Sequence, residues 1–333
     1  MQGAGGNTGN PSRNVKFMDI LWGILGTANI ARSSFLPGLR AAGGGGRAFA
    51  VASRTADRAK AYAAENGLDH GVAGYETLLA DDRIRAVYIP LPNSLHAEWT
   101  VRALRAGKAV LCEKPLCADL PETEAVVKEP GLLWEAFVFP FHAQMARVRE
   151  LIQSGAIGEL REIHSSFHFR LRSRANIRLD PGLAGGALND VGCYCVHLAT
   201  QYFGELPAFA RASAKMAPEG VDEELQGVLS FPGDRRLLLS CGLDRGRDCL
   251  SRLLGTEGEI RLSNPFHPGP ADTIEVHAGG RVTIEHPTGS EPSFAPAIRH
   301  IHAVLAEGAP PRHLAREDSL HTAAGMALLR AAL

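Results

Sequence analysis

The sequence has little of what marks a membrane protein or a nucleic-acid-binding protein. No apolar run approaches the roughly 18 residues that a membrane-spanning helix requires. Lysine and arginine together number 35 against 36 acidic residues, so the net charge is −1, and no basic block occurs. This balance removes the electrostatic basis of nucleic-acid binding. We therefore expect neither a membrane nor a nucleic acid as a partner.

The chain is also poor in the features that stabilise small secreted or metal-binding domains. Its six cysteines are scattered and form no CxxC pair, a pattern typical of free thiols in a reducing compartment. We expect a cytoplasmic protein without a metal site. With 333 residues, 45% of them hydrophobic and 21% charged, the chain is long enough for two domains. Residues 1–17, rich in glycine and asparagine and without a signal-peptide core, are expected to form a disordered tail.

Short apolar runs alternate with amphipathic stretches in the N-terminal half. Strands are expected at residues 19–25, 48–52, 86–89 and 109–112, and helices at 55–66 and 94–106. Strand-helix alternation at this spacing predicts an α/β fold with a parallel, doubly wound sheet.

The turn after the first expected strand is typical of a dinucleotide-binding site. Gly26 permits a tight turn, and the small residue Ala28 lets a pyrophosphate approach the backbone. Ala31 lets the next helix pack closely on the strand, and the amino end of that helix offers N–H groups to the phosphates. The expected cofactor contacts in this turn are Gly26, Thr27, Ala28, Asn29 and Ile30.

The end of the second expected strand indicates which dinucleotide is bound. Sites that prefer NAD place an acidic side chain there, which accepts a hydrogen bond from the ribose 2′-hydroxyl. This chain has Ser53 and Arg54, with Arg58 one helical turn further on. A hydroxyl and guanidinium groups match a 2′-phosphate, so the pattern favours NADP(H). The alternative is an ordinary helix start, with Thr55 as the cap, Asp57 in the first turn and two solvated arginines. As the acid of an NAD site, Asp57 is less well placed, because it lies inside the expected helix rather than at the strand tip.

A rigid loop follows the strand at 86–89. Pro90, Leu91 and Asn93 lie in a turn with two prolines, which is expected to run beside the nicotinamide ribose. His96 follows in the next helix and has two interpretations that remain open. It either contacts the cofactor or packs under the loop.

Glu113-Lys114-Pro115 comes directly after the strand at 109–112. Ligands of open α/β sheets bind outside the carboxyl ends of the strands. Because proline restricts the preceding residue to extended conformations, the Lys114 ammonium is expected to point away from the backbone. We place Glu113 and Lys114 beside the cofactor. Taken alone, an exposed lysine without a role is the alternative.

Several motifs together resemble those of the Gfo/Idh/MocA oxidoreductases. They are GTANIA at 26–31, PLPNSLHA at 90–97, AGK at 106–108, EKP at 113–115 and GGALNDVGCY at 185–194. The nearest resemblance is to the branch of dihydrodiol and D-xylose dehydrogenases, glucose-fructose oxidoreductase and sugar 3-ketoreductases. It implies a Rossmann domain and an α+β domain with a large, mostly antiparallel sheet. That sheet covers the nicotinamide and often forms the face of a homodimer or higher oligomer.

The C-terminal half agrees with this expectation. Strands are expected at residues 160–169, 208–216, 224–231, 236–242, 249–254, 272–276 and 281–286, the last two as a hairpin around Gly279-Gly280. A terminal helix at 316–332 is expected to pack on the first domain through Leu320, Ala324, Ala327, Leu328 and Ala331. The predicted divisions are residues 18–135 for NADP binding, 136–315 for substrate and dimer contacts, and 316–333 for the helix.

The resemblance carries over a catalytic group of Lys114, Asp190 and Tyr194. When a ketone is reduced, negative charge builds on its oxygen; an ammonium stabilises that charge and a tyrosine hydroxyl supplies the proton. The ammonium is also expected to lower the pKa of Tyr194, and Asp190 to orient Lys114 or a substrate hydroxyl. On a helix, Asp190, Tyr194 and His197 share one face. A buried structural helix is the alternative, and we assign His197 to packing.

The substrate is the part that the sequence determines least. His142, Phe169 and Asn189 are the expected substrate contacts, and the arginines within residues 167–172 suit either an anionic sugar or solvent. The resemblance implies a sugar or polyol, with keto-sugar reduction and aldose oxidation both open. A dihydrodiol or dicarbonyl substrate and a non-catalytic dinucleotide sensor are the alternatives.

The segment of residues 118–134 is shorter than is usual in the family, so a trimmed helix is expected there.

Overall fold

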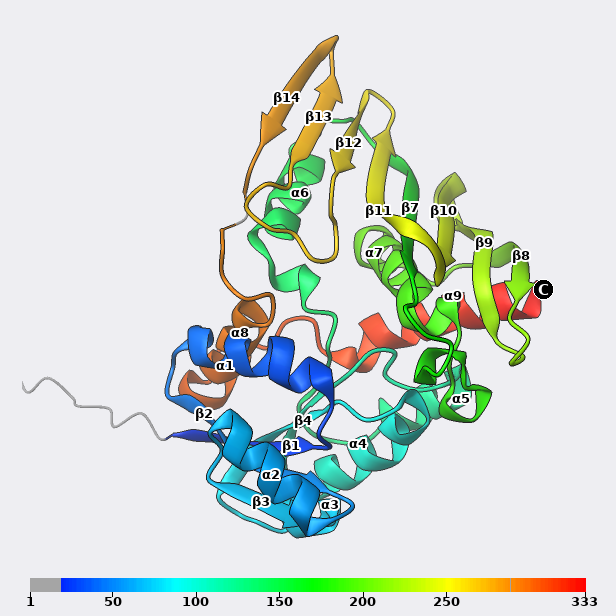
Figure 1. The fold of residues 1–333 in the computed structure, drawn as a ribbon. Helices are drawn as coiled ribbons and strands as arrows, with labels where there is room; N and C mark the ends of the chain where they lie inside the picture. The colour runs from blue at the N-terminus through cyan, green and yellow to red at the C-terminus, as the bar shows by residue number, and fades with distance from the viewer. Residues whose placement is uncertain (1–18, 288) are drawn as a thin grey trace, which may run out of the picture.

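The protein, in the computed structural model, consists of two sheets with their covering helices (Figure 1). The structure describes residues 19–287 and 289–333. The tail predicted for residues 1–17 lies outside the described residues. The predicted α/β fold, with a Rossmann domain followed by a large and mostly antiparallel sheet, is confirmed.

Sheet A is wholly parallel and forms the centre of the first domain. Its strands are β1 (Ile20–Leu25), β2 (Gly46–Ser53), β3 (His70–Ala73), β4 (Ile84–Ile89), β5 (Ala109–Cys112) and β6 (Leu133–Glu135). They lie in the order β3-β2-β1-β4-β5-β6, so the order reverses between β1 and β4. Such a reversal opens a crevice at the carboxyl ends of the strands. The sequence did not predict β3 and β6, which span only four and three residues.

Helices connect the strands and bury both faces of sheet A (Figure 1). They are η1 (Ala31–Phe35), α1 (Leu36–Ala42), α2 (Ala56–Asn66), α3 (Tyr75–Leu79), η2 (Asn93–Leu95), α4 (His96–Arg105) and α5 (Leu120–Val126). Helix α5 has only seven residues, as the short segment 118–134 predicts. It begins after Asp119, whose carboxylate accepts the Glu122 N–H at 2.9 Å.

Sheet B forms the centre of the second domain. Its strands are β7 (Leu160–Arg170), β8 (Phe209–Met216), β9 (Asp222–Phe231), β10 (Arg235–Gly242), β11 (Asp244–Gly255), β12 (Gly258–Leu262), β13 (Ile274–Ala278) and β14 (Arg281–Glu285). Neighbouring strands are antiparallel except β7 and β10. The hairpin turns at Gly279 and Gly280, whose φ angles of 56° and 72° suit glycine. The sequence did not predict β12.

Short helices link the two domains and cover sheet B. They are η3 (Phe139–Phe141), α6 (Ala143–Gln153), η4 (Ile177–Leu179), η5 (Pro181–Leu183), η6 (Leu188–Gly192) and α7 (Cys193–Phe203). Helix α7 contacts β7 and β10, and its residues from Cys193 to Thr200 are all buried. The segment with Asp190 and Tyr194 is therefore a π-helical turn, η6, that continues into α7, rather than one uniform helix.

Helix α8 (Ala295–Glu307) differs from its predicted place in the substrate domain, because it packs on α1 and β1 of the first domain. The Trp22 indole N–H donates to His302 Nε2 at 3.0 Å. A Cβ on Gly38 would lie 2.5 Å from the Phe294 Cβ, so α1 and the start of α8 are in close contact. The sequence pattern predicts that this helix has an apolar face, but it does not predict which of the two sheets that face covers.

The terminal helix α9 (Ala315–Ala331) lies between the domains (Figure 1, red). It contacts α5 and β6 on one side and α7, β8 and β9 on the other. Its buried residues are Ala315, Ser319, Thr322, Gly325, Met326 and Leu329. The buried face predicted from Leu320, Ala324, Ala327, Leu328 and Ala331 is therefore wrong: the first four are only partly buried, and Ala331 is exposed.

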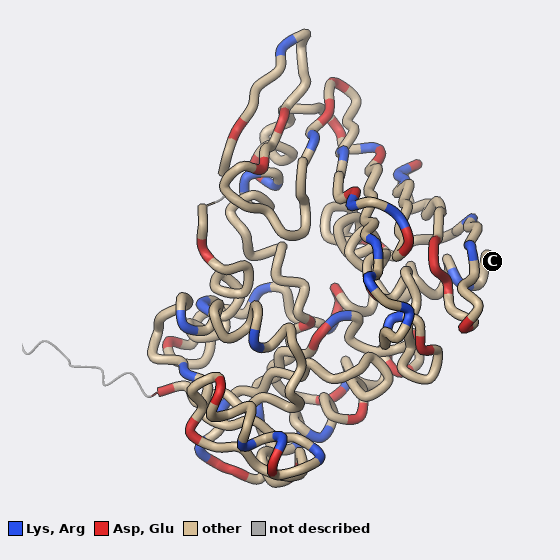
Figure 2. Tube along the Cα trace, viewed as in Figure 1, with Lys and Arg blue, Asp and Glu red and all other residues tan. Residues whose placement is uncertain are grey.

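Charged residues of both signs are intermixed over both domains (Figure 2). This distribution agrees with the net charge of −1. Among the described residues, no helix is both long and apolar enough to span a membrane.

Candidate active site

The turn after β1 has the shape that a dinucleotide requires. Gly26 has a φ of +103°, and a Cβ at this position would lie 2.9 Å from the Leu91 Cδ2. Glycine is thus required both by its backbone conformation and by the close approach of the loop after β4. The Gly26 N–H donates to the Ala52 carbonyl of β2 at 2.9 Å. The predicted residues 26–30 lie together at the carboxyl end of β1, where phosphates bind in this fold.

Arginines gather at the end of β2. Arg58 on α2 donates from Nε to the Thr27 hydroxyl at 2.7 Å, which joins the two predicted halves of the cofactor site. Arg54 and Arg58 are exposed, whereas Ser53 is buried. Asp57 lies in the first turn of α2, beyond the strand tip. Two guanidinium groups open to solvent fit a 2′-phosphate better than a 2′-hydroxyl.

The loop after β4 is held from below by His96. Its Nδ1 and Nε2 lie 2.7 Å and 2.8 Å from the carbonyl oxygens of Pro115 and Leu91, and the ring is fully buried. Both ring nitrogens are therefore occupied by backbone groups. The predicted direct contact with the cofactor does not fit this geometry; His96 packs under the loop, the second of the two interpretations.

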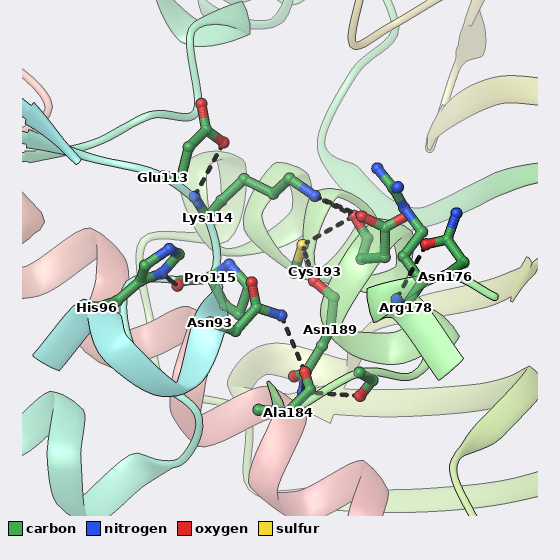
Figure 3. A network of polar contacts seen from close by, with 12 residues as sticks. Asn93, His96, Glu113, Lys114, Pro115, Asn176, Arg178, Ala184, Asn189 and Cys193 are labelled. Carbon is green, nitrogen blue, oxygen red and sulfur yellow. Dashed lines mark hydrogen bonds and ion pairs between the residues drawn. The ribbon is translucent and has the colours of Figure 1, made fainter. Parts of the chain in front are cut away.

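Asn93, in the same loop, has its side-chain amide bound elsewhere. Its Nδ2 donates to the Ala184 carbonyl at 2.9 Å (Figure 3). Asn93 therefore ties the cofactor loop to the segment before η6. Pro90 and Leu91 are buried around it. The contacts of this loop with a cofactor stay a prediction.

Lys114 meets Asp190 across the domain boundary. Its Nζ lies 2.5 Å from the Asp190 carbonyl oxygen and 3.0 Å from Asp190 Oδ1. Arg178 approaches from the opposite side and donates from Nε to Oδ2 at 2.6 Å (Figure 3). The carboxylate is thus shared by two cations and is only 13% exposed. The expectation that Asp190 orients Lys114 agrees with these contacts.

The charges of this cluster stabilise each other. Burial is the largest single influence and lowers the pKa of Lys114. The surrounding acidic groups, Asp190 first among them, together outweigh burial and raise the pKa above its usual value. For Asp190, burial raises the pKa, yet the charges of Lys114 and Arg178 hold it below its usual value. Lys114 is therefore an ammonium and Asp190 a carboxylate at neutral pH.

Tyr194 lies beside Lys114 and is 8% exposed. The Lys114 Nζ is 5.1 Å from the centre of the tyrosine ring. The expectation of a lowered pKa is wrong in this structure. Burial raises the pKa of Tyr194 well above 10, and the Lys114 ammonium offsets only part of that rise. Tyr194 therefore keeps its proton over the physiological range, as a proton donor requires.

Glu113 faces the interior next to this cluster. Its Oε1 accepts the Tyr88 hydroxyl at 2.5 Å, and burial raises its pKa. Its Oε2 accepts the Lys114 backbone N–H at 3.3 Å. The carboxylate thus supports the start of the lysine loop, and its contact with the cofactor stays a prediction. The Lys114–Pro115 peptide bond is cis.

The three predicted substrate contacts differ in their surroundings. Asn189 donates to the carbonyls of Ala184 and Gly185 and accepts from Arg330. Its amide is therefore fully used inside the protein, which contradicts its predicted role as a substrate contact. Phe169 lies under the Arg178 guanidinium, 5.7 Å from it. Its role stays a prediction.

His142 is buried at the start of α6. Its Nε2 lies 2.9 Å from the Ser293 carbonyl oxygen, and Nδ1 has no hydrogen-bond partner among the described residues. Burial lowers its pKa, so the ring is neutral at pH 7. Its contact with the substrate stays a prediction. His197, assigned to packing, is stacked on Phe137 at 4.0 Å in the core.

Sequence reasoning missed Arg178 and His267. Arg178 is the second cation on Asp190. His267 is exposed to solvent, and the centre of its ring is 5.6 Å from that of Tyr194. Arg178 lies in the three-residue helix η4, and His267 lies in the segment after β12. Neither belongs to one of the motifs, so no local pattern identifies them.

A parallel sheet with a dinucleotide turn, and a lysine-carboxylate pair beside a buried tyrosine, define an oxidoreductase of the dinucleotide-binding class. Two family descriptions match: "Oxidoreductase family, NAD-binding Rossmann fold" at residues 20–129 and "GFO/IDH/MocA C-terminal domain" at residues 145–261. The chain belongs to the Gfo/Idh/MocA oxidoreductase family, as the motifs predicted.

Two curated relatives are similar over most of their length. The chain is 37% identical over 310 residues to an NADP(+)-dependent D-xylose 1-dehydrogenase of Haloferax volcanii, covering 90% of this chain and 93% of the relative. It is 39% identical over 290 residues to a dTDP-3,4-didehydro-2,6-dideoxy-alpha-D-glucose 3-reductase of Streptomyces violaceoruber, covering 85% and 82%.

A solved structure is similar throughout the fold. The 3-ketoreductase of Actinomadura kijaniata, crystallised with NADP and TDP-benzene, superposes with a TM-score of 0.85 at 33% identity. The match covers 94% of this chain and 98% of that chain. Both sheets therefore belong to one conserved architecture.

Proposed function

We propose that the protein is an NADP(H)-dependent oxidoreductase that transfers hydride between the nicotinamide and a sugar or polyol, at a hydroxyl or carbonyl carbon. The observation that carries the proposal is the buried Lys114–Asp190 pair, with Tyr194 beside it at the boundary of the domains. The activities named for the similar xylose dehydrogenase and the keto-sugar reductase support a sugar. Keto-sugar reduction and aldose oxidation use the same groups in opposite directions.

The residues present fit the dinucleotide. Gly26 has a φ of +103°, which side chains rarely adopt, so the turn after β1 keeps an open backbone, and Arg58 is held beside the same turn by Thr27. The residues that would hold the cofactor are those of the turn after β1, together with Arg54 and Arg58. When bound, the dinucleotide supplies or accepts the hydride.

The chain's own side chains handle the charge and the proton. Lys114, kept cationic by Asp190, stabilises negative charge on the carbonyl oxygen of the substrate. Tyr194, kept protonated by burial, donates the proton to that oxygen. Asp190 and Arg178 hold the ammonium in place. In alcohol oxidation Tyr194 accepts the proton instead.

A spectrophotometric screen at 340 nm tests the proposed function. We expect turnover of NADP+ or NADPH with an aldose, polyol or keto-sugar, including a nucleotide-linked keto-sugar. Turnover of a trans-dihydrodiol or a dicarbonyl, but of no sugar, would contradict the sugar substrate and support the second candidate function, a dihydrodiol or dicarbonyl oxidoreductase. That candidate is favoured by the partly buried ring of Phe167, whose centre lies 5.4 Å from that of Tyr194. Tight NADPH binding without turnover of any carbonyl would instead indicate a sensor.

The cofactor preference has its own test in Arg58. Replacing Arg58 with glutamine removes a charge at the proposed 2′-phosphate site. Since a charge-assisted hydrogen bond contributes roughly 1.5–3 kcal/mol, we expect the Kd of NADPH to rise about 10- to 100-fold, while that of NADH changes little. Fluorescence titration with both dinucleotides measures this. An equal change for NADPH and NADH would contradict the assignment.

We also propose a homodimer formed through the open face of sheet B. The strand register places Phe209 and Leu250 on the same face of sheet B, and each of these two side chains is 52% exposed. Leu237 and Leu253 lie on the opposite face, in the core. A second copy would remove these apolar side chains from water. Light scattering coupled to gel filtration is expected to give twice the mass of 35.6 kDa.

The predicted cytoplasmic location is kept as part of the proposal. All six cysteines lie in the described part of the chain and are buried free thiols. Burial raises the pKa of Cys112, Cys193 and Cys241, which keeps these thiols protonated and unreactive. Such a set of thiols suits a reducing compartment.

A further inference from the structure

The two halves of the proposed active site come from different domains. Lys114 follows β5 of sheet A, whereas Asp190 and Tyr194 lie in η6 and α7 against sheet B. Their separation therefore depends on how the domains are joined. Helix α9 contacts both domains (Figure 1), and three of its polar side chains reach segments next to these catalytic residues.

The first contact holds the lysine loop. The Ser319 hydroxyl donates to Glu135 Oε2 at 2.5 Å, and Glu135 Oε1 accepts the Leu116 N–H at 2.8 Å. Leu116 is two residues after Lys114. The carbonyl of the same peptide group, that of Pro115, lies 2.7 Å from His96 Nδ1. The buried side chains of Glu135 and His96 thus hold the N–H and the carbonyl of this peptide group. Glu135 is in turn held by Ser319.

The second contact holds the helix of Tyr194. The Thr322 hydroxyl donates to the Asp318 carbonyl, so its oxygen accepts from His197 Nδ1–H at 3.0 Å. His197 lies one turn after Tyr194 on α7. Both side chains are buried, so this hydrogen bond does not exchange freely with water.

The third contact holds the segment of Asp190. The Arg330 guanidinium donates to Asn189 Oδ1, and the Asn189 amide donates to the Ala184 carbonyl at 2.9 Å. Asn189 is the residue before Asp190, and Ala184 also accepts from Asn93 of the cofactor loop. Arg330 thus stabilises the backbone around the carboxylate that holds Lys114.

The three α9 residues lie on one face of a rigid element. Ser319 and Arg330 are eleven residues apart, which is three helical turns and roughly 16 Å. Thr322 lies one turn after Ser319 on the same face. A small cavity between α9 and the loop after Lys114 is lined by Ser319, Thr322 and Arg330 as well. The three residues therefore face the active-site segments together.

We propose that α9 is the positioning element of the active site, with Ser319, Thr322 and Arg330 as positioning residues that set the distance between Lys114 and Tyr194. The proposal rests on the proposed function, because only a reaction that uses both residues depends on that distance. No α9 side chain needs to touch the substrate. The contacts act through Glu135, His197 and Asn189.

The test uses Ser319→Ala and Arg330→Met in the full-length protein, with Ser251→Ala as the matched control. Ser251 is also a buried serine, and its hydroxyl is bonded to that of Ser165 within sheet B at 2.8 Å. We expect kcat to fall about 10- to 100-fold in Ser319→Ala and Arg330→Met, since small misplacements of reacting groups have effects of that size. Kd for NADPH should stay within about threefold, and the deuterium isotope effect with labelled NADPH should rise. Arg330→Lys, which keeps a donor, should recover most of the activity.

A second measurement needs no substrate. Amide hydrogen exchange is expected to increase around residues 113–118 in Ser319→Ala and around 186–195 in Arg330→Met, with neither change in Ser251→Ala. Equal losses of kcat in Ser319→Ala and Ser251→Ala would overturn the proposal, as would unchanged exchange in both segments. If the wild-type protein turns over no carbonyl while the variants show these exchange changes, the proposed function is contradicted. The contacts of α9 would then hold the two segments without positioning a catalytic group, which overturns the proposal as stated.

Discussion

Replacing Lys114 with methionine is expected to lower kcat/KM about 100- to 1000-fold, the usual effect of removing a group that stabilises an oxyanion. Methionine keeps the length of the side chain but carries no charge. The developing negative charge on the carbonyl oxygen then has no cation near it, because Arg178 is bound to the far oxygen of Asp190. Steady-state kinetics on the substrate found in the screen measures the loss.

The same change removes one partner of a buried ion pair. Breaking such a pair costs up to roughly 3–5 kcal/mol of stability, and less here because Arg178 remains on Asp190. Lys108→Met is the matched control. Lys108 is a buried lysine just before β5, and its ammonium donates to the carbonyls of Asp81 and Ile84. The Lys108→Met variant should be less stable than the wild type but keep its kcat within a few-fold of the wild-type value. Lys114→Met with wild-type kcat/KM would eliminate the proposed mechanism.

Tyr194→Phe is expected to lower kcat for carbonyl reduction about 100-fold or more, the scale of a lost general acid. The ring remains in its aromatic surroundings, so NADPH binding and the melting temperature should change little. Tyr202→Phe is the matched control, because Tyr202 lies on the same helix and its hydroxyl donates to the Met145 sulfur at 3.4 Å. Comparable losses in both variants would argue against a proton-donating role.

The raised pKa of Tyr194 also predicts how each direction depends on pH. Burial disfavours the phenolate, so the hydroxyl stays protonated well above pH 7. Carbonyl reduction needs the protonated form and should show no loss of kcat between about pH 6 and 9. Alcohol oxidation needs a base and should rise with pH over the same interval. A reduction rate that falls tenfold per pH unit in this interval would mean that Tyr194 titrates near neutrality.

Sequence reasoning predicted the fold, and placed the proposed catalytic lysine, because both depend on short local patterns. The turn at Gly26 and the Glu113-Lys114-Pro115 motif follow apolar strands directly, so their place at the carboxyl ends of sheet A could be inferred. Asp190 and Tyr194 came from the family resemblance, and the structure brings Asp190 to 3.0 Å from the Lys114 ammonium.

The surroundings of these residues were harder to infer. His96 and Asn189 have polar side chains in suggestive positions, yet their partners are backbone groups or Arg330, far away in the chain. Arg178 lies in the three-residue helix η4 and His267 in the segment after β12, and stretches this short have no periodicity that predicts what a side chain contacts. The pKa of Tyr194 was predicted in the wrong direction, because a single ammonium is visible in the sequence and burial is not.

By itself, the sequence determined a dinucleotide fold of the Gfo/Idh/MocA type, because strand periodicity and glycine turns are properties of a few consecutive residues. It also gave the proposal of a catalytic lysine, carboxylate and tyrosine, the last two through the family resemblance. Only the tertiary structure decided which protonation states these groups adopt and how α8 and α9 join the domains. Those properties depend on burial and on contacts between residues as far apart as Trp22 and His302, and local patterns do not encode such contacts.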